Sequence, residues 1–464
     1  MAYNYISLAG LLTQLSERLD DEQNIYWTLA ELTEYIAEAL RTWQSMAGYW
    51  RGRMIFNTSL NTSFYDLTQQ TNSLIPFTVT DTQMVSEILY HLIEAQLTSA
   101  GVYVGTGMFN LDDITKAIER RRNQFLLETG MVLQQVSVPN PSPPESRVLL
   151  PDNVINIRRC AWLAPGGTPF GVGNFGAGPF NGPYGVLTNL WRSNQYAAQA
   201  FKQNWALQPQ DPPIEYSVAT DPPVTVDMIP PPLNPGTLKL LAVLAGSPLN
   251  PAVGVLMGVP DNLSWVVKWG ALADLLSKAG QAQDLPRADY CQKRWMQGIQ
   301  VARIHTSAIY AALNGKDTMI NALASFDSFN QNWQNGIAPP TDVALASWNM
   351  FAVSPPPDGI YSVRLDVIQN APIPVALTDQ VQIGREELDV LLDYCQHLAM
   401  FKQGGQEFLG TTPLFERMFR LAGVYNETLK ADVDFLEPMA DRAIREEILR
   451  PRRAAMPQPE TAEA

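Results

Sequence analysis

The amino-acid sequence predicts an α+β fold: a helical N-terminal region followed by two tandem units, each a β-hairpin packed on an antiparallel helix pair. Three observations lead to this prediction. Two stretches carry apolar residues at helical spacing. Each stretch follows alternating apolar runs that flank three consecutive prolines. The two sets recur at an offset of about 124 residues, which indicates an internal duplication.

The helix pairs lie at residues 259–304 and 383–429. The first helix of each pair has one apolar face. In the pair at 259–304 this face is formed by Trp265, Val266, Trp269, Leu272, Ala273 and Leu276. In the pair at 383–429 it is formed by Leu388, Leu391, Leu392, Cys395, Leu398 and Ala399. Gly280 and Gly404 follow these faces, and glycine readily takes the left-handed conformation that ends a helix. Further aromatic and apolar residues then predict a second helix in each copy.

The segments before the helix pairs carry the proline runs Pro230–Pro232 and Pro355–Pro357. A proline-rich turn between two alternating runs is typical of a β-hairpin, so we expect one hairpin per unit.

The N-terminal region is expected to be helical. Thr28 and Glu31 form a capping-box pair, and further helices begin after Thr80 and Asn110. The predicted domains are a helical region at 1–135, a first unit at 136–313, a linker at 314–341, a second unit at 342–440 and an extended basic tail at 441–464. The first unit contains a Gly/Pro-rich loop at 164–185, whose composition offers no core of its own.

Composition limits the classes of function. The chain has 464 residues, a net charge of −14 and a charged fraction of only 17%. This charge disfavours a general nucleic-acid binder, because affinity for phosphates comes mainly from clustered Lys and Arg. The apolar stretch at 238–259 is broken by prolines and glycines, so no membrane-spanning helix is expected.

No motif for catalysis, metal binding or cofactor binding is found. Gly171, Gly173 and Gly176 match G-x-G-x-x-G, but no strand precedes them and no helix follows. Cys395 and His397 are two apart on a helix and therefore point to different faces. We expect no catalytic residue, no metal and no cofactor, although a carboxylate pair brought together by folding would leave no motif.

Two basic clusters are candidate contact sites. Arg120, Arg121 and Arg122 stand mid-helix, where a solvated face and a contact with an acidic subunit or DNA are both open. The second cluster lies at the end of the acidic chain and comprises Arg442, Arg445, Arg450, Arg452 and Arg453. Docking onto a partner and a plain solubilising tail are both open for this second cluster.

Several passages resemble the head-to-tail connector proteins of tailed bacteriophages (adaptor, or tail-tubular A-like, proteins). They cover residues 3–50 and about 147–300, and include LTQLSERLDDEQNIYWTLAELTEYIAEALRTWQSMAGYW, RVLLPDNVINIRRCAWL and PPIEYSV. Such adaptors are usually much shorter, and the unit from Asp342 has no place in their simple pattern.

The resemblance implies a structural virion protein of the neck or tail, assembled in the host cytoplasm. It implies a homo-oligomeric ring, commonly dodecameric, that binds the portal protein and tail, nozzle or fibre proteins. Genomic DNA would pass through without specific binding, since an acidic lumen repels phosphate. The basic tail would bind the portal, with Arg120–Arg122 as a secondary contact. Two alternatives stay open: a fibre-docking collar, tail or baseplate protein outside the DNA path, and an enzyme whose site leaves no motif.

Overall fold

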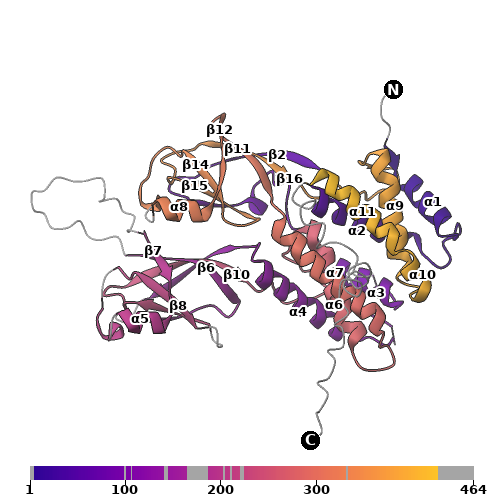
Figure 1. Ribbon diagram of the computed structural model, residues 1–464, viewed down its shortest axis with the longest axis horizontal. Coiled ribbons are helices and arrows are strands. Elements are labelled where there is room, and N and C mark those ends of the chain that lie inside the picture. Colours follow the sequence, from indigo (N-terminus) through magenta and orange to yellow (C-terminus); the bar gives the residue numbers. More distant parts are fainter. Residues whose placement is uncertain are drawn as a thin grey trace, which may run out of the picture. The chain divides into compact units, whose positions relative to one another are not determined.

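The computed structural model describes residues 5–98, 101–105, 107–140, 145–164, 187–201, 204–209, 212–219, 224–330 and 333–426. Helices and sheets both build the fold, which confirms the α+β class (Figure 1). The chain divides into two compact units, one formed by residues 1–39 and 376–464 and the other by residues 40–375.

The first unit is helical. Its elements are β1 (Ile6–Ser7), α1 (Leu8–Arg18), the start of α2 (Leu29–Ala47), β17 (Gln380–Val381), α9 (Arg385–Met400), α10 (Gly405–Gly410) and α11 (Thr412–Tyr425). Helix α11 packs against α9, and β1 pairs with β17. Arg18 joins α1 to α9 by donating to Asp393 at 2.6 Å and to Asp389 at 2.8 Å.

The second unit contains a seven-stranded sheet and two short helices, α5 (Gln195–Phe201) and η2 (Trp205–Leu207). We call this sheet and these two helices the inner module. The strands follow the order β4-β10-β6-β7-β8-β9-β5. They are β4 (Gln134–Asn140), β5 (Arg147–Leu149), β6 (Val154–Leu163), β7 (Leu187–Arg192), β8 (Glu215–Ala219), β9 (Thr225–Ile229) and β10 (Gly236–Leu244). Its core is apolar and includes Val138, Cys160, Trp162, Tyr216, Val226, Leu238 and Leu240.

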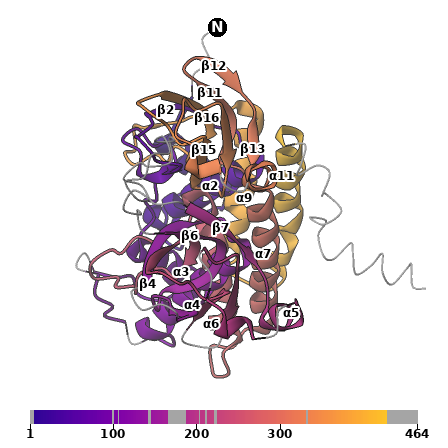
Figure 2. The same cartoon turned by 90° about the vertical axis from the view of Figure 1, so that its left-hand side faces the viewer.

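Two four-stranded sheets form the outer module of the same unit, with orders β12-β11-β16-β2 and β13-β14-β15-β3. The strands are β2 (Arg51–Asn57), β3 (Phe64–Asp66), β11 (Ala308–Leu313), β12 (Lys316–Thr318), β13 (Ile320–Ala322), β14 (Asp342–Leu345), β15 (Met350–Ser354) and β16 (Ser362–Ile368). Its short helices are α8 (Leu323–Phe329) and η4 (Trp333–Asn335). Figure 2 shows β11, β15 and β16 together in one sheet region and β6 and β7 in the other.

Four longer helices complete the second unit: α3 (Asp81–Leu92), α4 (Leu111–Thr129), α6 (Ser264–Ser277) and α7 (Leu285–Ile304). A short 3₁₀ helix, η3 (Asp261–Leu263), leads into α6. Helix α6 packs against both α4 and α7. Gly298 permits the close approach of α7 to α6, because a Cβ there would lie 2.5 Å from Cγ2 of Val266. The expected antiparallel helix pair at 259–304 is therefore present.

The predicted hairpins are wrong in both copies. Strand β9 pairs with β5 and β8, whereas β10 pairs with β4 and β6. Likewise β15 pairs with β14 and β3, whereas β16 pairs with β11 and β2. Alternating apolar residues identify a half-buried strand but not its neighbour. Each proline run therefore carries the chain between non-adjacent strands.

The two modules nevertheless share one sequence of elements. Antiparallel strands in each lead to a parallel pair, β7 with β8 and β13 with β14, joined through a short α-helix and a 3₁₀ helix. In each module the strand that pairs with β10 or β16 has a bulge, at Arg158 in β6 and at Ile309 in β11, and β6 has a second bulge at Ile155. Shared register, bulge and connection indicate one fold built twice.

The duplication is nested rather than tandem. Strands β2 and β3 of the outer module precede the inner module along the chain, and β11–β16 follow it. The expected linker at 314–341 belongs to the outer module, since it contains β12, β13, α8 and η4. A repeated F-x-Q-N-W sequence at 201–205 and 329–333 marks the equivalent corners of the two modules. Its tryptophans, Trp205 and Trp333, are both buried.

Candidate interaction surfaces

The arginines of the predicted portal-binding tail, Arg442, Arg445, Arg450, Arg452 and Arg453, lie outside the described residues. The Gly/Pro-rich loop at 164–185 does too, apart from Ala164. Portal binding by the tail therefore stays a prediction.

The basic cluster of α4, Arg120 to Arg122, is mostly engaged within the protein. Arg121 donates to Asp274 of α6 at 2.6 Å and lies 5.1 Å from the Trp295 ring. Arg122 is only 1% exposed, and burial lowers the pKa of its guanidinium. Helix α4 packs against α6 on the side of Arg121, and the Arg122 guanidinium lies against Gly246. Arg122 therefore cannot serve as a surface contact.

Arg120 is the member of the triplet that remains accessible. Its side chain is 66% exposed and lies 2.5 Å from Asp274. A surface ion pair of this kind is weak, so Arg120 can exchange Asp274 for another carboxylate at little cost.

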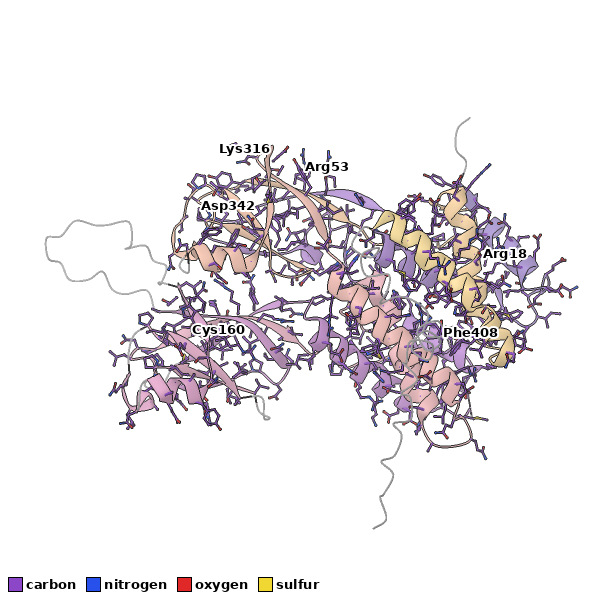
Figure 3. All side chains as sticks on the ribbon, viewed as in Figure 1. Arg18, Arg53, Cys160, Lys316, Asp342 and Phe408 are labelled. Carbon is purple, nitrogen blue, oxygen red and sulfur yellow. The ribbon has the colours of Figure 1, made fainter. Side chains whose placement is uncertain are left out.

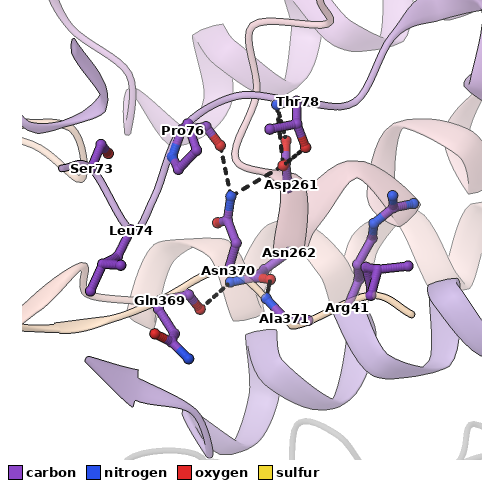
Figure 4. A pocket seen from close by; sticks show the side chains of 11 residues that line it. Arg41, Ser73, Leu74, Pro76, Thr78, Asp261, Asn262, Gln369, Asn370 and Ala371 are labelled. Atoms are coloured by element: carbon purple, nitrogen blue, oxygen red, sulfur yellow. Dashed lines mark hydrogen bonds between the residues drawn. The ribbon is translucent and has the colours of Figure 1, made fainter. Parts of the chain in front are cut away.

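A cavity of about 410 Å³ lies where three segments of the second unit meet (Figure 4). At its wall the buried Asp261 carboxylate accepts hydrogen bonds from the backbone N–H of Thr78 and Val79, from the Thr78 hydroxyl and from the Asn370 amide. Burial raises the pKa of Asp261, and these donors oppose the increase. The carboxylate thus joins three chain segments, a structural role that explains its burial.

A buried ionic cluster connects the helices of the second unit. Glu87 of α3 lies 3.3 Å from Arg41 and 3.7 Å from Lys268. Nζ of Lys268 is 3.1 Å from Nε2 of His91. Opposite charges offset the cost of burying one another, which accounts for the presence of this lysine inside α6.

The cysteine thiols and the potential metal ligands can be described for the residues that the structure covers. Cys160, Cys291 and Cys395 are buried and unpaired by disulfides, and burial raises the pKa of each thiol. Among the described residues, no group of three or more His, Cys, Asp or Glu side chains could hold a metal ion. Within these same residues, no helix has both the length and the apolarity needed to cross a membrane.

A polar contact of several residues joins the two modules. Arg159 of β6 donates to Asp327 of α8 at 3.0 and 3.2 Å and to Gln334 of η4 at 2.8 Å. Its guanidinium lies 5.5 Å from the Trp333 ring and 5.6 Å from the Phe64 ring. The arginine is thus held by both charge and aromatic contacts.

Strand β7 extends this contact. Asn189 donates to Asp327 at 3.0 Å. The Leu187 backbone exchanges two hydrogen bonds with the Asn335 amide, at 2.8 and 2.7 Å. We call Arg159, Leu187 and Asn189 the β6–β7 surface, and Phe64, Asp327, Trp333, Gln334 and Asn335 the α8–η4 corner. One module therefore binds the other through a defined surface and a defined corner.

Large apolar side chains are exposed at several other places on the two modules. The two modules can be located in Figure 3 by their labelled residues, which are Cys160 in the inner module and Lys316 and Arg53 in the outer module. The most exposed members include Tyr196, Leu207, Met319, Phe329 and Ile360.

Comparison with protein-family models matched none of them, and comparison with curated proteins found no match.

Proposed function

We propose that this chain is a structural subunit of a tailed-bacteriophage virion, forming a ring that joins the portal to the tail. One observation carries the proposal: the chain builds the same β-module twice and joins the copies through a specific surface and corner. A module that binds its own copy is suited to repeat that contact in a closed assembly.

Charge supports passage of the genome. The net charge of −14 disfavours binding to duplex DNA, so a channel formed by such subunits would not retain the DNA. The exposed apolar side chains of the modules provide surface for subunit contacts.

DNA-filled heads that carry a portal but no tail test this role. Full-length protein mixed with such heads should co-sediment with them and reduce spontaneous DNA release, measured with an intercalating dye. Capsids without a portal are the matched control. Equal co-sedimentation with both kinds of capsid would contradict the proposal.

A further inference from the structure

The contact between the modules inside one chain uses only half of the available surfaces. The β6–β7 surface of the inner module binds the α8–η4 corner of the outer module. Because the fold is built twice, the inner module has an equivalent corner and the outer module an equivalent strand surface. Neither of these two takes part in the contact described above.

Strand register identifies the equivalent residues. Arg159 lies across from β10 and Tyr310 across from β16, and each follows the bulged residue of its strand. Ala161 stands two residues after Arg159 in β6, and Ala312 stands two residues after Tyr310 in β11, so these two alanines are equivalent. Asn189 pairs with Ala161 and Asp317 pairs with Ala312, which makes Asn189 and Asp317 equivalent as well. The β11–β12 surface of the outer module is therefore formed by Tyr310, Gly315 and Asp317.

The F-x-Q-N-W sequences align the corners. Gln199 lies six residues before Trp205, and Asp327 lies six residues before Trp333, so Gln199 and Asp327 are equivalent. Ala206 and Leu207 likewise correspond to Gln334 and Asn335, and the first residues of β5 and β3, Arg147 and Phe64, correspond to each other. The α5–η2 corner of the inner module is therefore formed by Arg147, Gln199, Ala206 and Leu207.

Both surfaces are accessible. Leu207 at the α5–η2 corner is 80% exposed, and Arg147 keeps a 60% exposed side chain beside Asp227. On the β11–β12 surface, Ile309 is 46% exposed and the Asp317 side chain 75% exposed.

The residue exchanges between the copies are complementary. Inside the chain a cation, Arg159, meets an anion, Asp327. At the equivalent positions both charges are replaced by neutral groups, Tyr310 and Gln199, whose hydroxyl and amide can hydrogen-bond. A change on one side alone would leave a charge without its partner, which is costly when the contact excludes water.

The cation–ring contact is reversed in the same way. Arg159 lies over the Phe64 ring inside the chain, whereas the equivalent positions offer Arg147 as the cation and Tyr310 as the ring. Arg364 of the same chain already lies 5.7 Å from one side of the Tyr310 ring, and Arg147 is held by two hydrogen bonds to Asp227. Asp317, which accepts a hydrogen bond from Tyr310 and lies 3.9 Å from Arg364, adds a carboxylate opposite Arg147. Leu207 replaces the polar Asn335, so this contact would be more apolar than the one within the chain.

We propose that the α5–η2 corner of one chain docks onto the β11–β12 surface of a second copy, repeating between chains the contact that joins the modules within each chain. This deepens the proposed function by assigning the subunit contact of the ring. The contact is heterologous: each chain offers a corner at one module and a strand surface at the other, so assembly continues until it closes.

Introducing the charge pair of the in-chain contact tests the docking. Tyr310→Arg and Gln199→Asp should each weaken self-association of the full-length protein about tenfold. Tyr310→Arg replaces the ring that Arg147 would face by a second cation, and Gln199→Asp places a carboxylate on the side of the contact that faces Asp317. An equimolar mixture of the two variants should associate more tightly than either variant alone, since the new carboxylate of one chain meets the new guanidinium of the next. Sedimentation velocity over a concentration series measures the association, and native mass spectrometry shows alternation of the variants.

Leu207→Asp should also weaken association, whereas Val253→Asp is the matched control. Val253 is 75% exposed and belongs to neither surface. Circular dichroism should be the same for all variants because the substituted side chains lie at the surface.

Two results would overturn the inference in distinguishable ways. If the wild type assembles and the single variants assemble equally well, or their mixture stays as weak as either alone, the assigned contact is wrong while the ring function stands. If the wild type remains a monomer at tens of micromolar, the contact and the proposed function both fail.

Discussion

Replacing Arg159 by Met should break the contact between the two modules while leaving each module folded. The Arg159 side chain is 11% exposed and that of Asp327 is 31% exposed, so their ion pair is only partly solvated. Methionine keeps the apolar stem of the arginine in place and removes the charge.

The expected loss follows from the contacts. A hydrogen bond to a charged group contributes about 1.5–3 kcal/mol when buried, and a cation–π contact about 0.5–2 kcal/mol. Two bonds to Asp327 count less than fully because water reaches that carboxylate, and Asn189 and the Trp333 indole still donate to it. We therefore expect Arg159→Met to cost about 3 kcal/mol in the stability of the contact.

Hydrogen exchange at the Leu187 amide measures this loss locally, which matters because a chain of this size is not expected to unfold in one step. That amide donates to Oδ1 of Asn335 at 2.8 Å. A loss of about 3 kcal/mol corresponds to roughly 100-fold faster exchange. Combining the change with Asp327→Asn should reveal a coupling of about 1–2 kcal/mol.

Arg53→Met provides the matched control. Arg53 pairs with Asp366 across strands β2 and β16, and both side chains are substantially exposed, at 59% and 37%. Exposed pairs contribute about 0–1 kcal/mol. If Arg159→Met changes Leu187 exchange no more than Arg53→Met does, the contact between the modules does not have the energetic weight assigned to it.

Three further predictions concern pH, DNA and the basic tail. Burial lowers the pKa of His305 from 6.5 to about 4, so the unfolded chain binds the proton more readily and stability should fall by roughly 1–3 kcal/mol as pH drops through this range. His305→Gln should flatten the decline in urea midpoint between pH 7.5 and pH 4.5, and an unchanged slope would exclude this histidine as its cause. Purified protein should not bind duplex DNA at physiological salt, given the net charge of −14, and micromolar binding in a gel shift would contradict this. Deleting residues 441–464 should leave both units folded but abolish co-sedimentation with DNA-filled heads, whereas retained co-sedimentation would place the docking surface elsewhere.

The duplication was visible in the sequence, but its nested form was not. Proline runs and helix periodicity repeat at a constant offset in the second half of each copy. The first two strands of the outer module, β2 and β3, lie before the whole inner module, so they stand at a different spacing from their equivalents. Pairing β2 with β16 depends on contacts more than 300 residues apart, which local pattern does not specify.

Composition misled the prediction at residues 314–341. Polar and Asn/Gln-rich residues favour a linker, yet this segment contains β12, β13 and α8. These elements are short and lie toward the edge of their sheets, where few apolar residues are needed. The F-x-Q-N-W repeat was the available signal, because a chance linker would not share it with residues 201–205.

The basic helix shows a similar limit for the candidate sites. Arg120, Arg121 and Arg122 are adjacent, so their side chains point to different faces of α4. Only tertiary packing decides that Arg122 is buried, beside Gly246, and that Arg120 is exposed. The contact around Arg159 had no sequence signal, because its partners come from β3, α8 and η4.

Electron microscopy of the purified full-length protein tests the central claim most directly. The account predicts closed rings with a central pore, in which every chain contributes two similar β-modules related by the same contact within and between chains. Single chains, or a closed dimer without a pore, at concentrations of tens of micromolar would contradict it.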